Sequence, residues 1–340
     1  MWIRHRVARR RGGALLAVLW LTAALAAIAF AVASTVRAET ERSANALDSV
    51  RAYYLATGAI ERAILYMDWG PGAVAADGTP RYWAPWRSLL YFQFPAGDAV
   101  VEIIPESGKL NLNTATPEDL YALLVHLGAE PGRAREIALA IVDWRTPAAQ
   151  PTPFDQYYLS LTPSFQARHA SFEEVEEALL VKGMTPELFY GDYVTDEQGR
   201  LYPRGGFRDC VTVYGAGARL DVNTAPPALL AAVGLSPQAV SWIVERRRHG
   251  PFRAPRDLEP LAGEPGFHRL GLGGGTIYTL RATARLRLPN GALSDLRRSV
   301  AATIKRLPPG WDRTYHVLRW YENAWAHGPT PEVWLPAPAM

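Results

Sequence analysis

The sequence predicts an α+β fold in which a long amino-terminal helix, a small antiparallel sheet and a large helical region share one chain. Residues 13–67 form one unbroken segment that is first apolar and then amphipathic. Alternating, strand-like patterns stand on both sides of a helix-rich middle, and an eight-residue motif recurs after 110 residues. The 340 residues are enough for one elaborated domain or two ordinary ones.

The amino terminus has the composition of a basic leader followed by a membrane span. Five arginines fall within residues 1–12, whereas residues 13–36 contain no charged side chain. About 20 apolar residues in a helix cross a bilayer core, and the basic flank stays cytoplasmic. A cleaved secretory signal is the alternative, with Ala33-Ser34-Thr35 as a candidate cleavage region, although its apolar part is usually about 7–15 residues long.

Residues 37–68 continue this helix in amphipathic form. They contain no proline and a single glycine, Gly58, and the break comes at Trp69-Gly70-Pro71. Apolar residues recur at steps of three or four, which places them on one helix face: Tyr53, Ala56, Ile60, Ile64 and Met67. We therefore expect one helix from Gly13 to about Met67.

Strand patterns lie in residues 70–109 and again in residues 270–307. Residues 90–94 and 99–104 are rich in β-branched and aromatic side chains, with a turn between them. Residues 280–288 alternate apolar residues with arginines, and Asn290-Gly291 predicts a hairpin. We expect the arginine face to be solvated. The Pro- and Trp-rich tail, residues 308–340, either covers the sheet or docks a partner.

An internal repeat organises residues 110–265 as a helical domain. The segment Leu110-Asn111-Leu112-Asn113-Thr114-Ala115-Thr116-Pro117 matches Leu220-Asp221-Val222-Asn223-Thr224-Ala225-Pro226-Pro227. Each copy is followed by an apolar helix, a short glycine-containing hairpin and a second helix. Ser171 and Glu174 have the spacing of a capping box, which predicts a charged helix from Ser171.

The second copy has the order of a helix-hairpin-helix unit, a module that in many proteins binds DNA phosphates through hairpin N–H groups. Five arginines lie close to it: Arg246, Arg247, Arg248, Arg253 and Arg256. However, its hairpin is Gly-Leu-Ser and lacks a second glycine, and Glu130 stands in the hairpin of the first copy. We favour packing modules and expect no nucleic-acid partner. A membrane-anchored DNA-binding or uptake protein is the alternative.

A basic leader that ends in glycine, a bilayer-length apolar segment and a continuous amphipathic helix resemble type IV pilins and pseudopilins. In that family a prepilin peptidase cuts after the leader glycine, which here implies a cut between Gly12 and Gly13, with Gly13/Ala14 as the next candidate. Most pilins carry Glu at mature position five, where this chain has Ala17. The missing Glu and the paired Asn-Thr-Ala segments resemble the minor pseudopilin K family of type II secretion systems.

This resemblance implies a pilin-like fold with an inserted helical domain, in a single-pass protein of the bacterial inner membrane whose carboxyl-terminal domain is periplasmic. It implies assembly at the tip of the pseudopilus, which supports export of folded proteins across the outer membrane. The implied partners are minor pseudopilins I and J, the major pseudopilin, the inner-membrane secretion platform and the prepilin peptidase. A type IV pilus minor pilin is a further alternative.

Some members of the family hold Ca²⁺ in the loop that follows the first repeat. Calcium takes six to eight oxygen ligands and usually several carboxylates. In this chain only Asp143 and Asp155 stand at suitable positions, whereas residues 146 and 148–150 are not acidic. We therefore expect no cofactor, and Asp143 and Asp155 are the candidate calcium residues.

No set of residues has the spacing of a catalytic site, so we expect no enzyme and no catalytic residues. The seven histidines show no metal-binding spacing, and the glycines of residues 271–275 precede a strand, which is the wrong order for a phosphate loop. Cys210 is expected to be buried.

The chain has a net charge of +3 from 36 basic and 33 acidic residues. Loss of the five leader arginines leaves a net charge of −2, which weakens the nucleic-acid interpretation.

Overall fold

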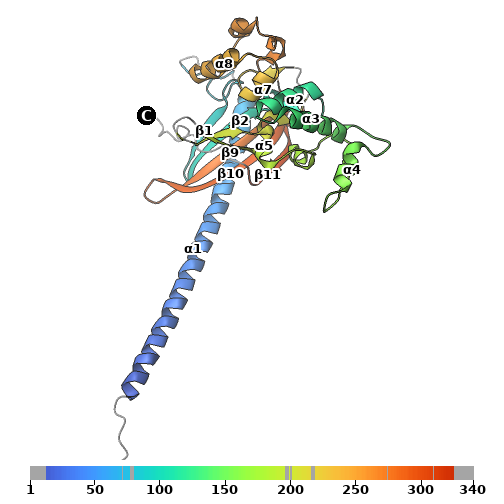
Figure 1. Cartoon of the computed structure of the whole chain (residues 1–340). Coiled ribbons are helices and arrows are strands. Elements are labelled where there is room, and N and C mark those ends of the chain that lie inside the picture. The colour runs from blue at the N-terminus through green and yellow to red at the C-terminus, as the bar shows by residue number, and fades with distance from the viewer. Residues whose placement is uncertain are drawn as a thin grey trace, which may run out of the picture.

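The structure is a computed structural model that describes residues 13–70, 72–76, 80–195, 199, 201–215, 219–273, 275–308 and 310–324. A single long helix projects from a body in which a sheet and a group of shorter helices pack together (Figure 1). The predicted α+β class is confirmed. Residues 1–12, which include Gly12, and the end of the tail lie outside the described residues.

Helix α1 (Gly13–Trp69) has two halves with different surroundings. Its first half stands clear of the body, and its buried residues begin at Ala52. Ala52, Ala56, Ala59 and Ala63 lie one turn apart on the buried face, where their small side chains let the helix axis approach the sheet closely. The amphipathic pattern therefore marks the half of the helix that packs against the body.

The sheet has five antiparallel strands in the order β1-β2-β9-β10-β11. Their bounds are β1 (Leu89–Phe94), β2 (Gly97–Pro105), β9 (Ile277–Arg287), β10 (Leu293–Arg306) and β11 (Tyr315–Tyr321). Because β2 and β9 are neighbours in the sheet, everything between residues 105 and 277 is an insertion between two paired strands. The insertion is the helical domain.

The first repeat runs from β3 to β6. The short 3₁₀ helix η1 (Glu106–Gly108) precedes it. The elements of the repeat are β3 (Leu110–Asn111), α2 (Pro117–His126), α3 (Pro131–Arg145), α4 (Pro153–Leu159), η2 (Val175–Leu180), α5 (Pro186–Tyr190), β4 (Gly191–Thr195), β5 (Leu201–Gly205), α6 (Phe207–Cys210) and β6 (Val211–Thr212). Strands β3 and β6 pair in parallel and close the unit.

The second repeat is shorter and is closed in the same way. It comprises β7 (Leu220–Asp221), α7 (Pro227–Ala232), α8 (Pro237–His249), η3 (Pro255–Leu261), η4 (Phe267–Arg269) and β8 (Leu270–Gly271). Strands β7 and β8 pair in parallel, as β3 and β6 do. One hydrophobic core runs through both repeats, and a second lies between α1 and the sheet.

The arginine face of β9 differs from the prediction. Arg281 is only 3% exposed and bonds Glu102 on β2, and Thr279 on the same face is also buried. The reason is that the insertion folds back over the end of β9 from which it emerges, whereas Arg287 at the far end is exposed. A solvated face is therefore wrong for Arg281 and right for Arg287.

Two further elements differ from the pattern-based predictions. Ser171 starts no helix: the turn is the 3₁₀ helix η2, and the Glu177 carboxylate accepts from the N–H groups of Glu173 and Glu174. Within the Pro- and Trp-rich tail, β11 is the fifth strand, and Trp320 packs against the sheet core. The sequence of β11, Tyr-His-Val-Leu-Arg-Trp-Tyr, is rich in the aromatic residues typical of strands, a signal that the prediction for this tail did not use.

Candidate functional site

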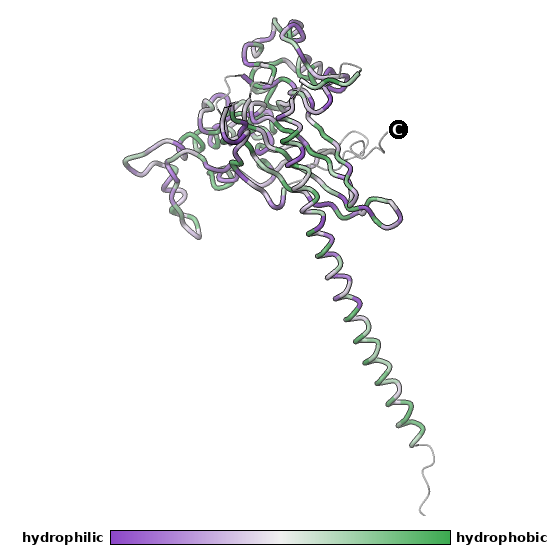
Figure 2. Tube along the Cα trace, turned by 180° about the vertical axis from the view of Figure 1, so that it is seen from behind, coloured by the Kyte–Doolittle hydropathy of each residue, from purple (hydrophilic) through white to green (hydrophobic). Residues whose placement is uncertain are grey.

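The apolar half of α1 is the largest uncovered hydrophobic surface of the described chain. Leu15, Trp20 and Phe30 are at least 75% exposed, and the whole stretch to Val36 is uncovered (Figure 2). Helix α1 is long and apolar enough to cross a membrane, judged by length and composition. Such a surface is stable only in lipid or against other apolar helices, so this half of α1 suits a single-pass membrane anchor.

The predicted processing site borders this helix. Gly13 and Ala17 both lie in exposed parts of α1, and its first turn contains no acidic residue. Gly12 is outside the described residues, so cleavage between Gly12 and Gly13 stays a prediction.

In the helical domain, each repeat holds a distant phenylalanine with one asparagine. The Asn113 amide donates to the Phe172 carbonyl at 3.0 Å and accepts from its N–H at 2.7 Å. Asn223 makes the same two bonds with Phe252, at 3.0 and 2.8 Å. The asparagines of the sequence repeat are therefore structural clamps.

An arginine at the end of the second helix completes each unit. The Arg145 guanidinium donates to the carbonyls of Leu112 and Ala115, and that of Arg247 donates to the carbonyl of Val222. Burial lowers the pKa of Arg247 to about 10. These hydrogen bonds hold α3 and α8 against the repeated motif, and they occupy both guanidinium groups with backbone carbonyl oxygens.

Both helix-hairpin-helix turns have their backbone donors occupied by carboxylates of the chain itself. Glu130 accepts from the N–H groups of Gly132 and Arg133, each at 2.9 Å, and these bonds lower its pKa. In the second hairpin Glu264 accepts from the N–H of Ser236 at 2.7 Å and from its hydroxyl at 2.8 Å. A nucleic-acid phosphate would have to displace a carboxylate at either hairpin. Glu130 was identified from the sequence, whereas Glu264 lies 28 residues from its partner and was missed.

The candidate calcium residues lie near each other, but their oxygens are already engaged. Asp155 accepts from the Thr152 N–H at 2.8 Å and contacts His169 Nε2 at 2.9 Å, while Asp143 accepts from the Thr152 hydroxyl. His169 Nδ1 lies within 3.2 Å of the carbonyl oxygens of Asp143 and Thr146. Both ring nitrogens thus face only acceptors, which the protonated imidazolium satisfies.

The electrostatics agree with this arrangement. Burial lowers the pKa of His169, but the hydrogen bond and charge of Asp155 outweigh it, so that the pKa stands above its ordinary value. Burial likewise raises the pKa of Asp155, but the bonds from Thr152 and His169 bring it below the ordinary value. Among the described residues no group of three or more His, Cys, Asp or Glu side chains could hold a metal. The donors present do not fit Ca²⁺, and its absence stays a prediction.

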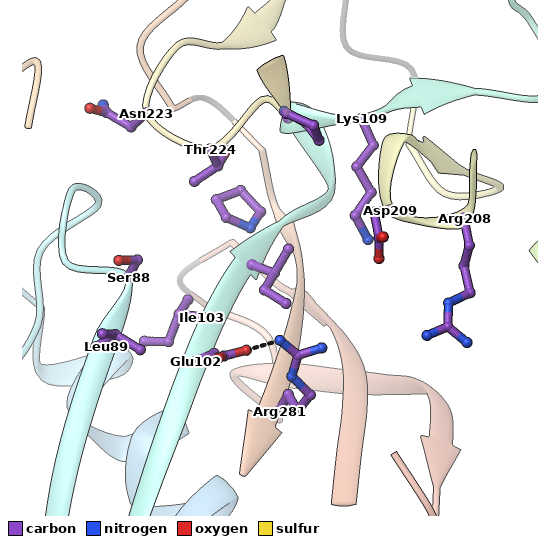
Figure 3. Close-up of a pocket in the computed structure, with 14 residues that line it drawn as sticks. Ser88, Leu89, Glu102, Ile103, Lys109, Arg208, Asp209, Asn223, Thr224 and Arg281 are labelled. Atoms are coloured by element: carbon purple, nitrogen blue, oxygen red, sulfur yellow. Dashed lines mark hydrogen bonds and ion pairs between the residues drawn. The ribbon is translucent and has the colours of Figure 1, made fainter. Parts of the chain in front are cut away.

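A cavity of about 370 Å³ lies where the helical domain meets the sheet (Figure 3). Glu102 and Arg281 form an ion pair across two strands on one wall, and Lys109, Arg208 and Asp209 approach from the helical domain. The lining contains neither His nor Cys, and its charged groups have partners within the chain. This cavity is a seam between two parts of the molecule and lacks a nucleophile with an adjacent base.

A larger polar cavity of about 760 Å³ separates the two repeats and includes the glycines Gly271, Gly273 and Gly275. Here the N–H of Gly273 donates to Asp221, and Arg269 pairs with Asp119 at 3.0 Å. The Arg269–Asp119 ion pair therefore joins the repeats, whereas the Gly273 contact lies within the second repeat. Cys210 is buried as predicted, and desolvation raises its pKa to about 12.

Comparisons with known proteins agree with this architecture. The family model "Type II secretion system (T2SS), protein K" matches residues 107–190. Type II secretion system protein K of Klebsiella pneumoniae is 26% identical over 200 residues, which cover 53% of this chain and 60% of that protein. The human endonuclease/exonuclease/phosphatase family domain-containing protein 1 is 29% identical over 177 residues, 50% of this chain but 28% of that protein. The chain thus spans less than two thirds of either relative.

Among solved structures, a chain of the GspK-GspI-GspJ complex from the type 2 secretion system of enterotoxigenic Escherichia coli has a similar fold. The match has a TM-score of 0.51 at 17% identity and covers 85% of this chain and 99% of that chain. The fold is therefore a pilin-like α+β fold, and the exposed apolar half of α1 is consistent with a single-pass membrane anchor. Within the helical domain, residues 107–190 match the type II secretion system protein K family model, and the Klebsiella protein K is the relative of that name to which the chain is similar.

Proposed function

We propose that this protein is a minor pseudopilin of a type II secretion system, which assembles at the pseudopilus tip and supports export of folded proteins. The observation that carries the proposal is the division of α1: its second half packs on the sheet, while residues 13–47 are all exposed in the described chain. An anchored helix of this kind can exchange lipid contacts for contacts with neighbouring subunit helices.

Two features support a terminal position. In most pilins the Glu at mature position five offers a carboxylate to the amino terminus of a neighbouring subunit. Ala17 offers no carboxylate to a subunit above it. The helical domain also adds bulk beside the sheet, where a subunit stacked above would have to fit (Figure 1). The related structure is a complex with GspI and GspJ, so we propose subunits of those two kinds as the direct partners.

The proposed topology places residues 1–12 in the cytoplasm and the sheet and helical domain in the periplasm. The role is one of assembly, without catalysis. Its support is that the charges lining the cavity of about 370 Å³ are paired within the chain and that the repeats are held by backbone clamps.

Deletion of the gene and complementation with the full chain tests the function. We expect secreted proteins to accumulate in the periplasm of the deletion strain and to reappear in the medium on complementation. Twitching and DNA uptake are measured in the same strains. Unchanged secretion together with a twitching defect would identify a type IV pilus subunit, and an uptake defect alone would identify a DNA receptor.

A further inference from the structure

The two repeats carry opposite charges at equivalent positions. In the first repeat the clamped Phe172 begins the segment Phe-Glu-Glu-Val-Glu-Glu, and in the second Phe252 begins Phe-Arg-Ala-Pro-Arg-Asp. The backbone geometry of the segments agrees, because Asp257 accepts from the N–H groups of Arg253 and Ala254 as Glu177 does from those of Glu173 and Glu174. The same loop therefore presents carboxylates in one copy and guanidinium groups in the other.

The acidic copy is neutralised within the chain. Arg168 pairs with Glu173 and with Glu177, the latter at 3.2 Å, and Arg319 of β11 pairs with Glu174. These cations come from segments outside the loop, so the carboxylates of the first repeat form ion pairs within the chain.

The basic copy has no such neutralisation. Arg253 and Arg256 are exposed, and within the described chain neither makes an ion pair; Arg253 lies 5.4 Å from the ring centre of Trp86. Arg248 and His249 are each 73% exposed at the side chain and contact only Glu245, on their own helix. Asp257 and Glu259 are the nearby acids on η3, and Asp257 is engaged by backbone N–H groups.

These cations surround a hollow. A pocket of about 280 Å³ is lined by Arg246, His249, Gly250, Pro251, Arg253, Ala254, Arg256 and Asp257, and the Arg246 guanidinium donates to the Gly250 carbonyl at 2.7 Å. Two backbone hydrogen bonds lower the pKa of Asp257, and the positive charges of Arg246 and Arg256 lower it further. Both guanidinium groups therefore interact with the same carboxylate. Helix α8, which contributes Arg246 and His249 to this lining, lies at the end of the body opposite the free half of α1 (Figure 1).

We infer that this basic surface, defined by Arg246, Arg248, His249, Arg253 and Arg256, is a docking site for a protein that presents clustered Asp and Glu side chains. Guanidinium groups form paired hydrogen bonds with carboxylates, and exposed complementary charge speeds and orients docking. Duplex DNA is the weaker candidate, because the hairpin N–H donor of this repeat is occupied by Glu264. The inference goes beyond the proposed role in assembly and does not depend on it.

The test uses the purified full chain in detergent and a fluorescein-labelled 12-residue peptide of alternating Glu and Gly, read by fluorescence anisotropy. The Arg248→Glu/Arg256→Glu double variant should weaken binding by about tenfold or more, and binding should fall as salt screens the charges. The matched control with the same change in net charge is the Arg297→Glu/Arg313→Glu double variant, two exposed arginines outside the helical domain, which should change the affinity less than about twofold. Arg297→Glu alone is measured as well. A peptide with Gln in place of Glu should not bind.

Three results would overturn the inference. The first is undiminished peptide binding by the Arg248→Glu/Arg256→Glu variant, and the second is an equal loss with the Arg297→Glu/Arg313→Glu variant, which would mean that general charge and not this surface binds the peptide. The third is binding of a labelled 20-base-pair duplex that is tighter than peptide binding and is lost in the Arg248→Glu/Arg256→Glu variant. Melting curves of all three variants establish that they fold.

Discussion

Asn113 and Phe172 are 59 residues apart in the chain and are joined by two hydrogen bonds, one in each direction, between a side-chain amide and a peptide backbone. Asn223 makes the same contact with Phe252 across 29 residues. The extra chain in the first repeat, which contains α4 and the candidate calcium residue Asp155, is therefore inserted without a change at the clamp. This geometry lets one unit acquire a loop while both units pack alike.

Replacement of Asn113 by Ala should destabilise the first repeat by about 2–4 kcal/mol, because a buried N–H and a buried carbonyl each lose a partner. Asn113→Asp should cost less, since its carboxylate still accepts from the Phe172 N–H but cannot donate to the carbonyl. Urea unfolding measures both, with Asn45→Ala on the exposed half of α1 as the neutral control. Equal effects of Asn113→Ala and Asn45→Ala would refute the clamp.

Calcium should leave the thermal stability of the full chain unchanged relative to EDTA. A specific ligand at about 100 times its dissociation constant would add about 2.7 kcal/mol, which melting curves detect easily. A calorimetric signal for Ca²⁺ binding would contradict the expected absence.

His169→Gln should increase protease cleavage between residues 146 and 169, because Gln cannot donate hydrogen bonds to Asp155 and to the two carbonyl groups together.

Gly12→Asp should prevent removal of the leader, since by family resemblance the peptidase requires the glycine before the cut. The amino-terminal residue, determined by mass spectrometry, should be Gly13 in the unaltered protein and Met1 in the variant. Ala17→Glu leaves the cleavage point intact and should be processed normally. Efficient processing of Gly12→Asp would refute the assigned cut.

Ala59→Leu should weaken the contact between α1 and the sheet by about 1–3 kcal/mol, because Ala59 is fully buried and the larger side chain has no space. Ala46→Leu makes the same change on the exposed part of the same helix and should shift the unfolding free energy by less than about 0.5 kcal/mol. Comparable effects at both positions would mean that helix propensity, and not packing, determines the outcome.

Cys210 should resist alkylation in the folded protein. With its pKa raised to about 12 by burial, roughly one thiol in ten thousand is ionised at pH 8. Iodoacetamide labelling followed by mass spectrometry should show slow modification in native buffer and rapid modification in guanidinium chloride. Rapid labelling of the native protein would show that this part of the helical domain opens readily.

The sequence by itself determined the features that depend on neighbouring residues. Helical periodicity indicated α1 and its change of character, and the motif at Leu110 and Leu220 located both repeats, because turns and helix starts are set by local backbone chemistry. The tertiary structure decided which distant groups meet. It buried Arg281 under the insertion, brought Glu264 to the hairpin at Ser236 and added β11 to the sheet. Burial and ion pairing depend on segments far apart in the chain. The local sequence therefore shows the opposite charges of the loops at Phe172 and Phe252, but not that Arg319 of β11 pairs with Glu174 in the first loop while Arg253 and Arg256 stay exposed in the second.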